Sequence, residues 1–319
     1  MAFRFAGRPV LVTGAAGFIG SHVADRLVAE GCEVHVLDDL SGGVRSNVPD
    51  GATFHELDVR SEAAAALFVE HRFAALCHLA AQMDVRKSVT NPKFDAEVNV
   101  LGFLNLLEAG RQNGLEKVTF ASTGGAIYGE PDPAVNDGGP QPETHPTQPL
   151  SPYGITKLVS EHYLRFYANT YGLETAALRF GNVYGPRQNP HGEAGVVAIF
   201  AQRLMRGEPV QINGDGTQTR DYVYVKDVVR AFVAALANEG SGVYNVGTGV
   251  ETDVNELFHH INRLTGAGAG EVHGPGMPGE QKRSVLDVTH TGEALGWAPT
   301  VAVADGLAET VEWFRQREG

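Results

Sequence analysis

Positive charge, cysteine and long apolar runs are all scarce in this chain. Its 319 residues hold 25 lysines and arginines against 38 aspartates and glutamates, which gives a formal net charge of −13. Such an acidic balance argues against a surface that binds nucleic acid or an acidic membrane. No apolar run approaches the length needed to span a bilayer, and no N-terminal signal peptide is recognisable, so we expect a cytoplasmic protein.

Only two cysteines are present, Cys32 and Cys77, in or beside apolar segments and without metal or redox spacing. We expect both to be reduced and buried. The twelve histidines show no His-x-His or His-x-x-x-His pattern, and the adjacent His259 and His260 would point to different helix faces. The spacing therefore predicts no metal site.

Three glycines near the N-terminus separate a predicted strand from a predicted helix. Residues 8–13 are apolar and rich in β-branched side chains, as in a buried parallel strand, and residues 21–30 have the pattern of an amphipathic helix. Gly14 and Gly17 permit a tight turn and the close approach of a pyrophosphate, and Gly20 lets the helix pack on the strand. The segment predicts the first unit of a Rossmann fold with a dinucleotide site.

A carboxylate follows the second predicted strand. Residues 33–37 form this strand, and Asp38 comes directly after it. A carboxylate in this place accepts hydrogen bonds from the adenosine ribose hydroxyls and repels a 2′-phosphate. The sequence therefore predicts NAD rather than NADP, and Arg45 in the next loop is the only feature that favours NADP.

Tyr153 and Lys157 stand four residues apart at the start of a strongly helical stretch. Side chains at this spacing share one helix face, and a fixed ammonium beside a phenol lowers the phenol's pKa from its usual value of about 10. A positively charged nicotinamide ring would lower this pKa further. The pair suits a base that removes a proton from an alcohol while a hydride leaves the same carbon. Alone, the pair also fits a surface tyrosine beside a solvated lysine, so the preceding dinucleotide site supplies the context.

Strand and helix patterns alternate along the first 180 residues, which predicts an α/β fold with a doubly wound parallel sheet. Among the predicted helices are residues 94–112 and 152–171. We expect a Rossmann-type NAD-binding domain over residues 1–180 and a smaller nucleotide-sugar-binding lobe over residues 181–319, with elements interleaved between them. Residues 131–149, rich in Pro, Gly, Gln and Asn, predict a loop that covers a cleft or is mobile.

A series of different short motifs extends along almost the whole chain. They cover residues 12–22, 37–41, 78–82, 126–129, the pair 153 and 157, and residues 178–187, 214–223 and 244–247. With these motifs the chain resembles the extended short-chain dehydrogenase/reductase superfamily, and within it the nucleotide-sugar 4-epimerases of the UDP-glucose type.

The resemblance implies a role for each matching position. The cofactor would be bound by Gly14, Gly17, Phe18, Ile19, Gly20, Asp38, Asp39, Asp58, Val59, Leu79, Ala80, Ala81, Asn99, Ser122, Tyr153, Lys157 and Phe180. The UDP-sugar would be held by Asn182, Arg220, Arg283 and Ser284. Asn99 also fits a polar residue on a helix face, and Arg220 also fits an exposed loop arginine.

The implied reaction is transient oxidation of the sugar at C4. Tyr153 takes the proton of the 4-hydroxyl, the hydride passes to NAD, and the 4-keto sugar turns over before the hydride returns to its other face. Relatives that dehydrate or decarboxylate sugars carry an acidic residue in the turn before Tyr128, whereas residues 122–128 contain none. Its absence favours plain epimerisation.

The chain departs from the family pattern in that same turn. Relatives place a serine or threonine four residues before the tyrosine, where this chain has Gly124. We expect Thr123 to supply the missing hydroxyl as a catalytic residue, with Ser122 behind it. The alternative is that the loop is only a glycine turn and Tyr153 works alone.

A second departure concerns the substrate diphosphate. Relatives often have an arginine where Met277 stands, and Lys282 or Arg283 would take its place here. Ser284 falls where the family sets pocket size, and its small side chain predicts that an N-acetylhexosamine is accepted besides UDP-glucose and UDP-galactose.

Three other functions remain open at this point. Epimerisation of UDP-glucuronate would need an arginine facing the C5 carboxylate, for which Arg86 and Arg187 are candidates. A net NAD-dependent dehydrogenase or reductase would exchange its cofactor with solvent. A nucleotide sensor would have no reason to keep Tyr153 and Lys157. The helices over residues 94–112 and 152–171 are those by which relatives pair, so we also expect a homodimer.

Overall fold

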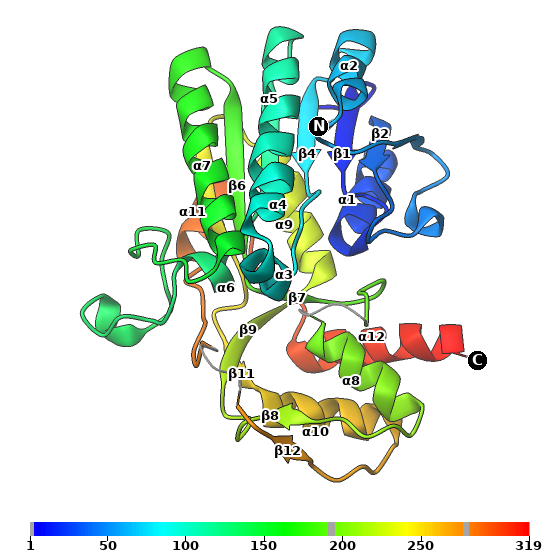
Figure 1. The fold of residues 1–319 in the computed structure, drawn as a ribbon, viewed down its shortest axis with the longest axis vertical. Helices are drawn as coiled ribbons and strands as arrows, with labels where there is room; N and C mark the ends of the chain where they lie inside the picture. The colour runs from blue at the N-terminus through cyan, green and yellow to red at the C-terminus, as the bar shows by residue number, and fades with distance from the viewer. Residues whose placement is uncertain (1–2, 191–194, 277–280, 319) are drawn as a thin grey trace.

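A parallel sheet lies at the centre of the protein, in the order β10-β6-β5-β4-β1-β2-β3 (Figure 1). The computed structural model describes residues 3–190, 195–276 and 281–318, and in them this sheet has seven strands. The strands are β1 (Pro9–Thr13), β2 (Glu33–Asp38), β3 (Thr53–Glu56), β4 (Ala75–His78), β5 (Lys117–Thr123), β6 (Glu174–Phe180) and β10 (Gly242–Val246).

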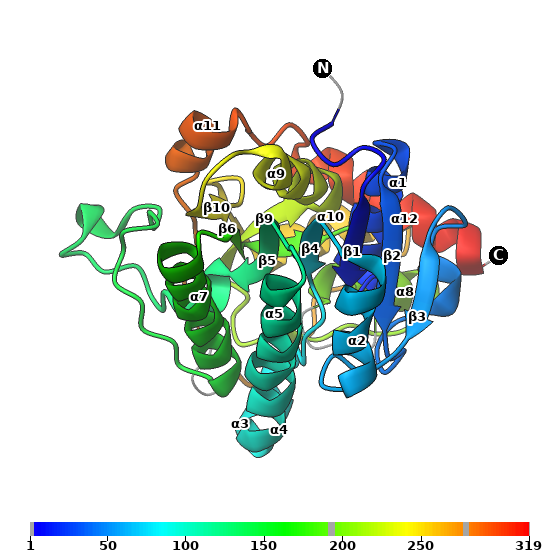
Figure 2. The ribbon, with the colours of Figure 1, turned by 90° about the horizontal axis from the view of Figure 1, so that it is seen from above.

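Helices cover both faces of this sheet, as Figure 2 shows. One face carries α2 (Glu62–His71), α3 (Val85–Thr90), α4 (Pro92–Ala96), α5 (Phe103–Gln112) and α7 (Pro152–Tyr171). The other face carries α1 (Phe18–Ala29), α9 (Val225–Ala237) and α11 (Thr289–Leu295). Strand β1 shows why helices are needed on both faces, because Val10 and Val12 pack in one apolar cluster and Leu11 packs in the other. A strand buried on both sides explains the unbroken apolar run in the sequence.

A smaller lobe lies below the carboxyl ends of the strands in Figure 1. It contains a three-stranded sheet of β11 (Glu251–Asp253), β9 (Thr219–Tyr224) and β7 (Asn182–Tyr184), and a pair of β12 (His273–Gly274) and β8 (Ile212–Asn213). Its helices are α8 (Val196–Met205), α10 (Val254–Thr265) and α12 (Val303–Glu318). The carboxyl ends of the parallel strands therefore face the smaller lobe, and α/β proteins bind ligands at this end of the sheet.

The predicted α/β fold class is confirmed, and one predicted helix is interrupted. The expected helix over residues 94–112 begins instead at Pro92, as α4, and passes through a π-helical turn, Glu97–Gly102, before α5. Such turns recur at functional sites, and this one contains Asn99. The division at residue 180 stays a prediction, although β10 and α9 of the second segment pack on the large sheet.

Within the described residues, no helix combines the length and apolar character needed to cross a membrane.

Candidate active site

The glycine turn between β1 and α1 is packed too tightly for side chains. A Cβ atom at Gly20 would lie 2.3 Å from the carbonyl oxygen of Gly14, and one at Gly14 would lie 2.7 Å from the backbone nitrogen of Ala80. Gly14 also has a φ of +71°, which favours glycine. Helix α1 begins after Gly17 without a side-chain cap, so its first N–H groups are available to an anion such as a pyrophosphate.

The carboxylate of Asp38 ends β2 beside this turn. One oxygen accepts a hydrogen bond from the backbone of Ala16 at 3.0 Å, and the other accepts one from the backbone of Leu40 at 2.9 Å. Burial raises the pKa of Asp38, and these two bonds oppose the shift. Arg45 stacks on the ring of Phe54, with its guanidinium carbon 4.4 Å from the ring centroid. Arg45, the one residue that favoured NADP, is thus packed against Phe54.

Three further positions assigned to the cofactor lie on the next loops. The exposed Asp39 accepts hydrogen bonds from Ser41, and Asp58 is paired with Arg60, whose hydrogen bonds lower the pKa of Asp58. Val59 is buried against Gly102, where a Cβ would lie 2.7 Å from Val59 Cγ2. The π-helical turn thus packs directly on the loop after β3.

Asn99 braces the loop that follows β4. Its side-chain oxygen accepts from the backbone of Gln82 at 2.8 Å, and its nitrogen donates to the carbonyl of Gln82 at 2.9 Å. The backbones of Leu79 and Ala80 both bond to the Thr13 hydroxyl at 3.2 Å. Asn99 is almost fully buried, and its bonds together with those of Thr13 fix the path of residues 79–82, which include the predicted cofactor residue Ala81. Sequence reasoning missed the part played by Thr13, whose bonding partners lie more than sixty residues away.

Tyr153 and Lys157 lie in the first turns of α7. Ser151 caps this helix by accepting from the backbone of Gly154 at 3.2 Å, and Pro152 occupies its first turn. Lys157 is buried, donates to the carbonyl of Ala121 in β5 at 2.8 Å, and holds its Nζ 5.9 Å from the centroid of the Tyr153 ring. The predicted neighbourhood of ammonium and phenol is therefore present.

The predicted lowering of the tyrosine's pKa is wrong for the protein without cofactor. Burial and the nearby Asp95 raise the pKa of Tyr153, and burial lowers the pKa of Lys157 to about 8. The ammonium of Lys157 favours the phenolate, but burial disfavours the charged form of both side chains. Lys157 alone does not make Tyr153 a base.

The end of β5 contains Ser122 and Thr123, and they differ in their hydrogen bonds. Thr123 ends β5 and precedes α6 (Gly124–Ile127), which has no side-chain cap. The hydroxyl of Ser122 instead donates to Glu161 at 2.5 Å, and Glu161 is paired with the buried Arg179. Ser122 is thus held inward by a pair that sequence reasoning did not identify, because its members come from α7 and β6.

Two of the residues assigned to the sugar, Asn182 and Ser284, lie near Gly125. A Cβ at Gly125 would lie 3.8 Å from the side-chain oxygen of Asn182 and 3.9 Å from the hydroxyl of Ser284. Arg220 lies in β9 opposite Thr252 and donates to the carbonyl of Thr219 at 2.8 Å. The structure therefore brings Asn182 and Ser284 to the start of α6, just after Thr123. Phe180 is buried at the end of β6, two residues before Asn182.

Arg283 is engaged elsewhere in the lobe. Its Nε donates to Glu251 at 3.1 Å, its Nη2 also pairs with Glu251, and its Nη1 donates to the carbonyl of Gly138 at 3.1 Å. These bonds tie the loop of residues 131–149 to β11. Met277, the position of the second sequence departure, lies outside the described residues.

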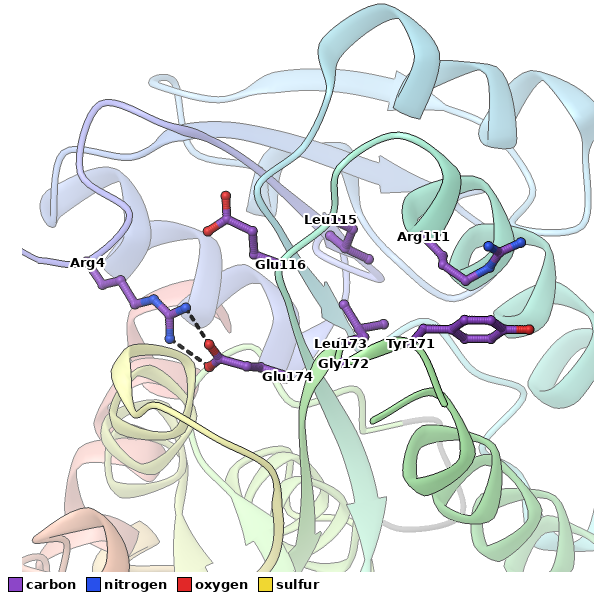
Figure 3. Close-up of a pocket in the computed structure, with 8 residues that line it drawn as sticks. All are labelled: Arg4, Arg111, Leu115, Glu116, Tyr171, Gly172, Leu173 and Glu174. Carbon is purple, nitrogen blue, oxygen red and sulfur yellow. Dashed lines mark hydrogen bonds and ion pairs between the residues drawn. The ribbon is translucent and has the colours of Figure 1, made fainter. Parts of the chain in front are cut away.

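A cleft of about 300 Å³ lies at the opposite end of the large sheet, beside the amino-terminal ends of the strands (Figure 3). Its walls come from the amino-terminal ends of β5 and β6 and include Arg4, which forms two hydrogen bonds of 2.8 Å with Glu174. Since Tyr153 and the glycine turn border the carboxyl ends of the strands, this cleft is separate from the candidate active site.

A Rossmann sheet whose glycine turn is followed by a buried lysine beside a helical tyrosine defines an extended short-chain dehydrogenase/reductase. Comparison with known proteins agrees, because the model of the NAD dependent epimerase/dehydratase family matches residues 10–247. The chain belongs to this family.

Relatives and solved structures match over almost the full length. The chain is 48% identical to a UDP-glucose 4-epimerase of Mycolicibacterium smegmatis, over 96% of this chain and 98% of the relative. A UDP-glucose 4-epimerase of Thermotoga maritima, solved with UDP-glucose, has 48% identity and a TM-score of 0.94, covering 98% of this chain and 100% of the other. A UDP-glucose 4-epimerase of Thermus thermophilus, solved with NAD, has 48% identity and a TM-score of 0.89, covering 96% and 99%. The resemblance inferred from the motifs is confirmed.

Proposed function

We propose that the protein interconverts UDP-glucose and UDP-galactose by inverting C4 through a 4-keto sugar. The observation that carries the proposal is the pair Tyr153 and Lys157, placed on α7 beside the turn that holds Thr123. Near full-length similarity to UDP-glucose 4-epimerases supports it.

The cofactor residues present fit NAD. Gly14, Gly17 and Gly20 permit the tight turn before α1, whose uncapped first N–H groups would bind a pyrophosphate, and Asp38 would accept hydrogen bonds from a ribose. Phe18, Ile19 and the backbone of residues 79–81 border the same turn. When bound, NAD would supply the hydride acceptor for the oxidation at C4.

Tyr153 moves the proton of the reaction. Its phenol oxygen takes the proton from the sugar 4-hydroxyl during oxidation and returns it during reduction. Burial and Asp95 raise the pKa of Tyr153, and the positive charges of Lys157 and of an oxidised nicotinamide ring would each oppose this shift. Thr123 donates a hydrogen bond to the reacting oxygen.

Asn182 and Arg220 hold the sugar nucleotide, and Arg283 contributes to its diphosphate once released from Glu251. A guanidinium matches a diphosphate through paired N–H donors. Ser284 has a small side chain and lies near Gly125, so we propose that an acetamido group at C2 is accepted and that UDP-N-acetylglucosamine is also a substrate. Turnover confined to the two hexoses would refute this second substrate.

The test of the function is incubation with a panel of UDP-sugars without added NAD, followed by separation of the C4 epimers. We expect interconversion of UDP-glucose and UDP-galactose by the parent and a loss of at least about 1,000-fold in Tyr153→Phe. Net formation of NADH would instead indicate a dehydrogenase, and epimerisation of UDP-glucuronate alone would indicate the other epimerase. The pairing of Arg187 with Asp25 at 2.7 Å argues against UDP-glucuronate, because it engages an arginine that would have to face the C5 carboxylate.

We also propose a homodimer formed through α5, the π-helical turn and α7, which lie side by side on one outer face (Figure 2). Leu101, Ile155, Tyr163 and Phe166 are large apolar residues that are 37–59% exposed there. Sedimentation is expected to give the mass of two chains, and Phe166→Arg is expected to give one. A monomeric parent would contradict the dimer. Cytoplasmic localisation stays a prediction.

A further inference from the structure

Three histidines from separate parts of the sequence lie close together at the edge of the large sheet formed by β2 and β3. His35 lies in β2, His55 lies in β3, and His71 is the last residue of α2. One side-chain nitrogen from each lies within 4.8 Å of the others. In parallel register His35 is opposite Thr53, so His55 falls two residues further along the same face, which α2 covers.

The three rings already form a compact group. Nδ1 of His35 is 3.0 Å from Nε2 of His55, and the centroids of His35 and His71 are 4.3 Å apart. Two nitrogens bound to one tetrahedral zinc ion at about 2.0–2.1 Å would be about 3.3 Å apart, so the first pair already has the required separation. The third donor nitrogen, on His71, lies within 4.8 Å of the other two.

The surroundings suit a cation bound by neutral imidazoles. Nε2 of His35 is 3.4 Å from the carboxylate of Glu33, the arrangement that orients a metal-binding histidine through its other nitrogen. His71 stands at the carboxyl end of α2, where the helix dipole favours positive charge, and Glu70 lies 3.8 Å from it.

Access differs among the three ligands. His35 is almost completely buried, whereas the side chain of His71 is 24% exposed and leaves the group open to solvent on one side. Three histidines with a water in the fourth position form one of the tetrahedral zinc sites known in proteins.

We propose that His35, His55 and His71 bind one divalent transition-metal ion of the zinc type, separate from the Tyr153 centre. The ion joins β2, β3 and α2 as a structural clamp. The strands that carry His35 and His55 lead to Asp38 and Asp58, each three residues further along, so the clamp lies about 10 Å from the adenosine end of the cofactor site. Local spacing in the sequence predicted no metal site, because the ligands come from three separate elements.

The test uses untagged protein treated with a chelator and titrated with Zn²⁺ by calorimetry, with Co²⁺ as a spectroscopic probe of coordination. We expect one ion per chain, a tetrahedral Co²⁺ spectrum and a higher melting temperature with the metal. His71→Gln and His55→Gln are each expected to weaken binding at least about tenfold. Thermal melting and circular dichroism of each variant without metal establish that it is folded.

A matched control removes two surface histidines that lie near one carboxylate. His259 and His273 lie 2.8 Å and 3.2 Å from Glu271, so the double variant His259→Gln/His273→Gln tests for adventitious surface binding. Binding that persists in this control and weakens in His71→Gln supports the proposal. Binding lost in the control, unchanged in a folded His71→Gln variant, or absent for both metals overturns it.

Discussion

Leu286 fills the space that a side chain at Gly124 would need. A Cβ atom at position 124 would lie 2.6 Å from Cδ2 and 2.8 Å from Cδ1 of Leu286. Leu286 is fully buried, and its backbone nitrogen lies 3.3 Å from the carboxylate of Asp221, which accepts its N–H. The departure from the family pattern at Gly124 is thus matched by a compensating residue more than 160 positions away.

Thr123→Val is expected to lower kcat about 100-fold, because the reacting oxygen loses a hydrogen bond that is strongest in the transition state. KM for UDP-glucose should change little. Steady-state kinetics of parent and variant provide the measurement. Turnover within a few-fold of the parent would remove Thr123 from the mechanism and leave Tyr153 to act without a hydroxyl partner.

Gly124→Ser is expected to lower the free energy of unfolding by about 1–3 kcal/mol, because the new side chain collides with Leu286. Gly125→Ser is the matched control, since the nearest atoms to its Cβ are 3.8 and 3.9 Å away. Urea unfolding of the three proteins measures the difference. Equal stability of the two variants would show that Leu286 yields easily and does not explain the glycine.

Lys157 predicts a specific dependence of stability on pH in the protein stripped of cofactor. Burial lowers its pKa to about 8, below the unfolded value of about 10.4, so the cost of burying the charge is present below pH 8 and is relieved as the pH rises between these values. The free energy of unfolding of the parent should therefore rise relative to that of Lys157→Met from pH 8 to pH 10. A difference that stays constant or falls would contradict the shift.

Glu251→Gln is expected to lower KM for UDP-glucose several-fold, because it releases Arg283 from the ion pair that now holds it. Glu256→Gln is the control, since Glu256 lies on α10 and the basic side chain near it is His260 rather than an arginine. In the background Arg283→Ala, the gain from Glu251→Gln should vanish. An unchanged KM in Glu251→Gln would exclude Arg283 from diphosphate binding.

Features that depend on neighbours in the chain could be predicted from the sequence. The strand, the three glycines and Asp38 lie within 30 residues, and the structure shows why Gly14 and Gly20 admit no side chain. The spacing of Tyr153 and Lys157 likewise follows from helix geometry.

Features that depend on tertiary packing could not be predicted. The pKa of Tyr153 is set by burial and by Asp95, which comes from α4. The pairing of Arg283 with Glu251 requires β11 to be placed beside the segment after β12. The histidine group likewise appears only when two strands and a helix are assembled. In each case the sequence shows the residues but not the contact.

The most direct test of the account follows the hydrogen at C4 of the sugar. UDP-galactose deuterated at C4 is incubated with the protein in ordinary water without added NAD, and the UDP-glucose formed is examined by mass spectrometry and proton NMR. Transfer of a hydride away from C4 and back predicts that the deuterium is retained at C4, with no product from Tyr153→Phe. Loss of the deuterium to water would contradict hydride transfer and the mechanism built on it.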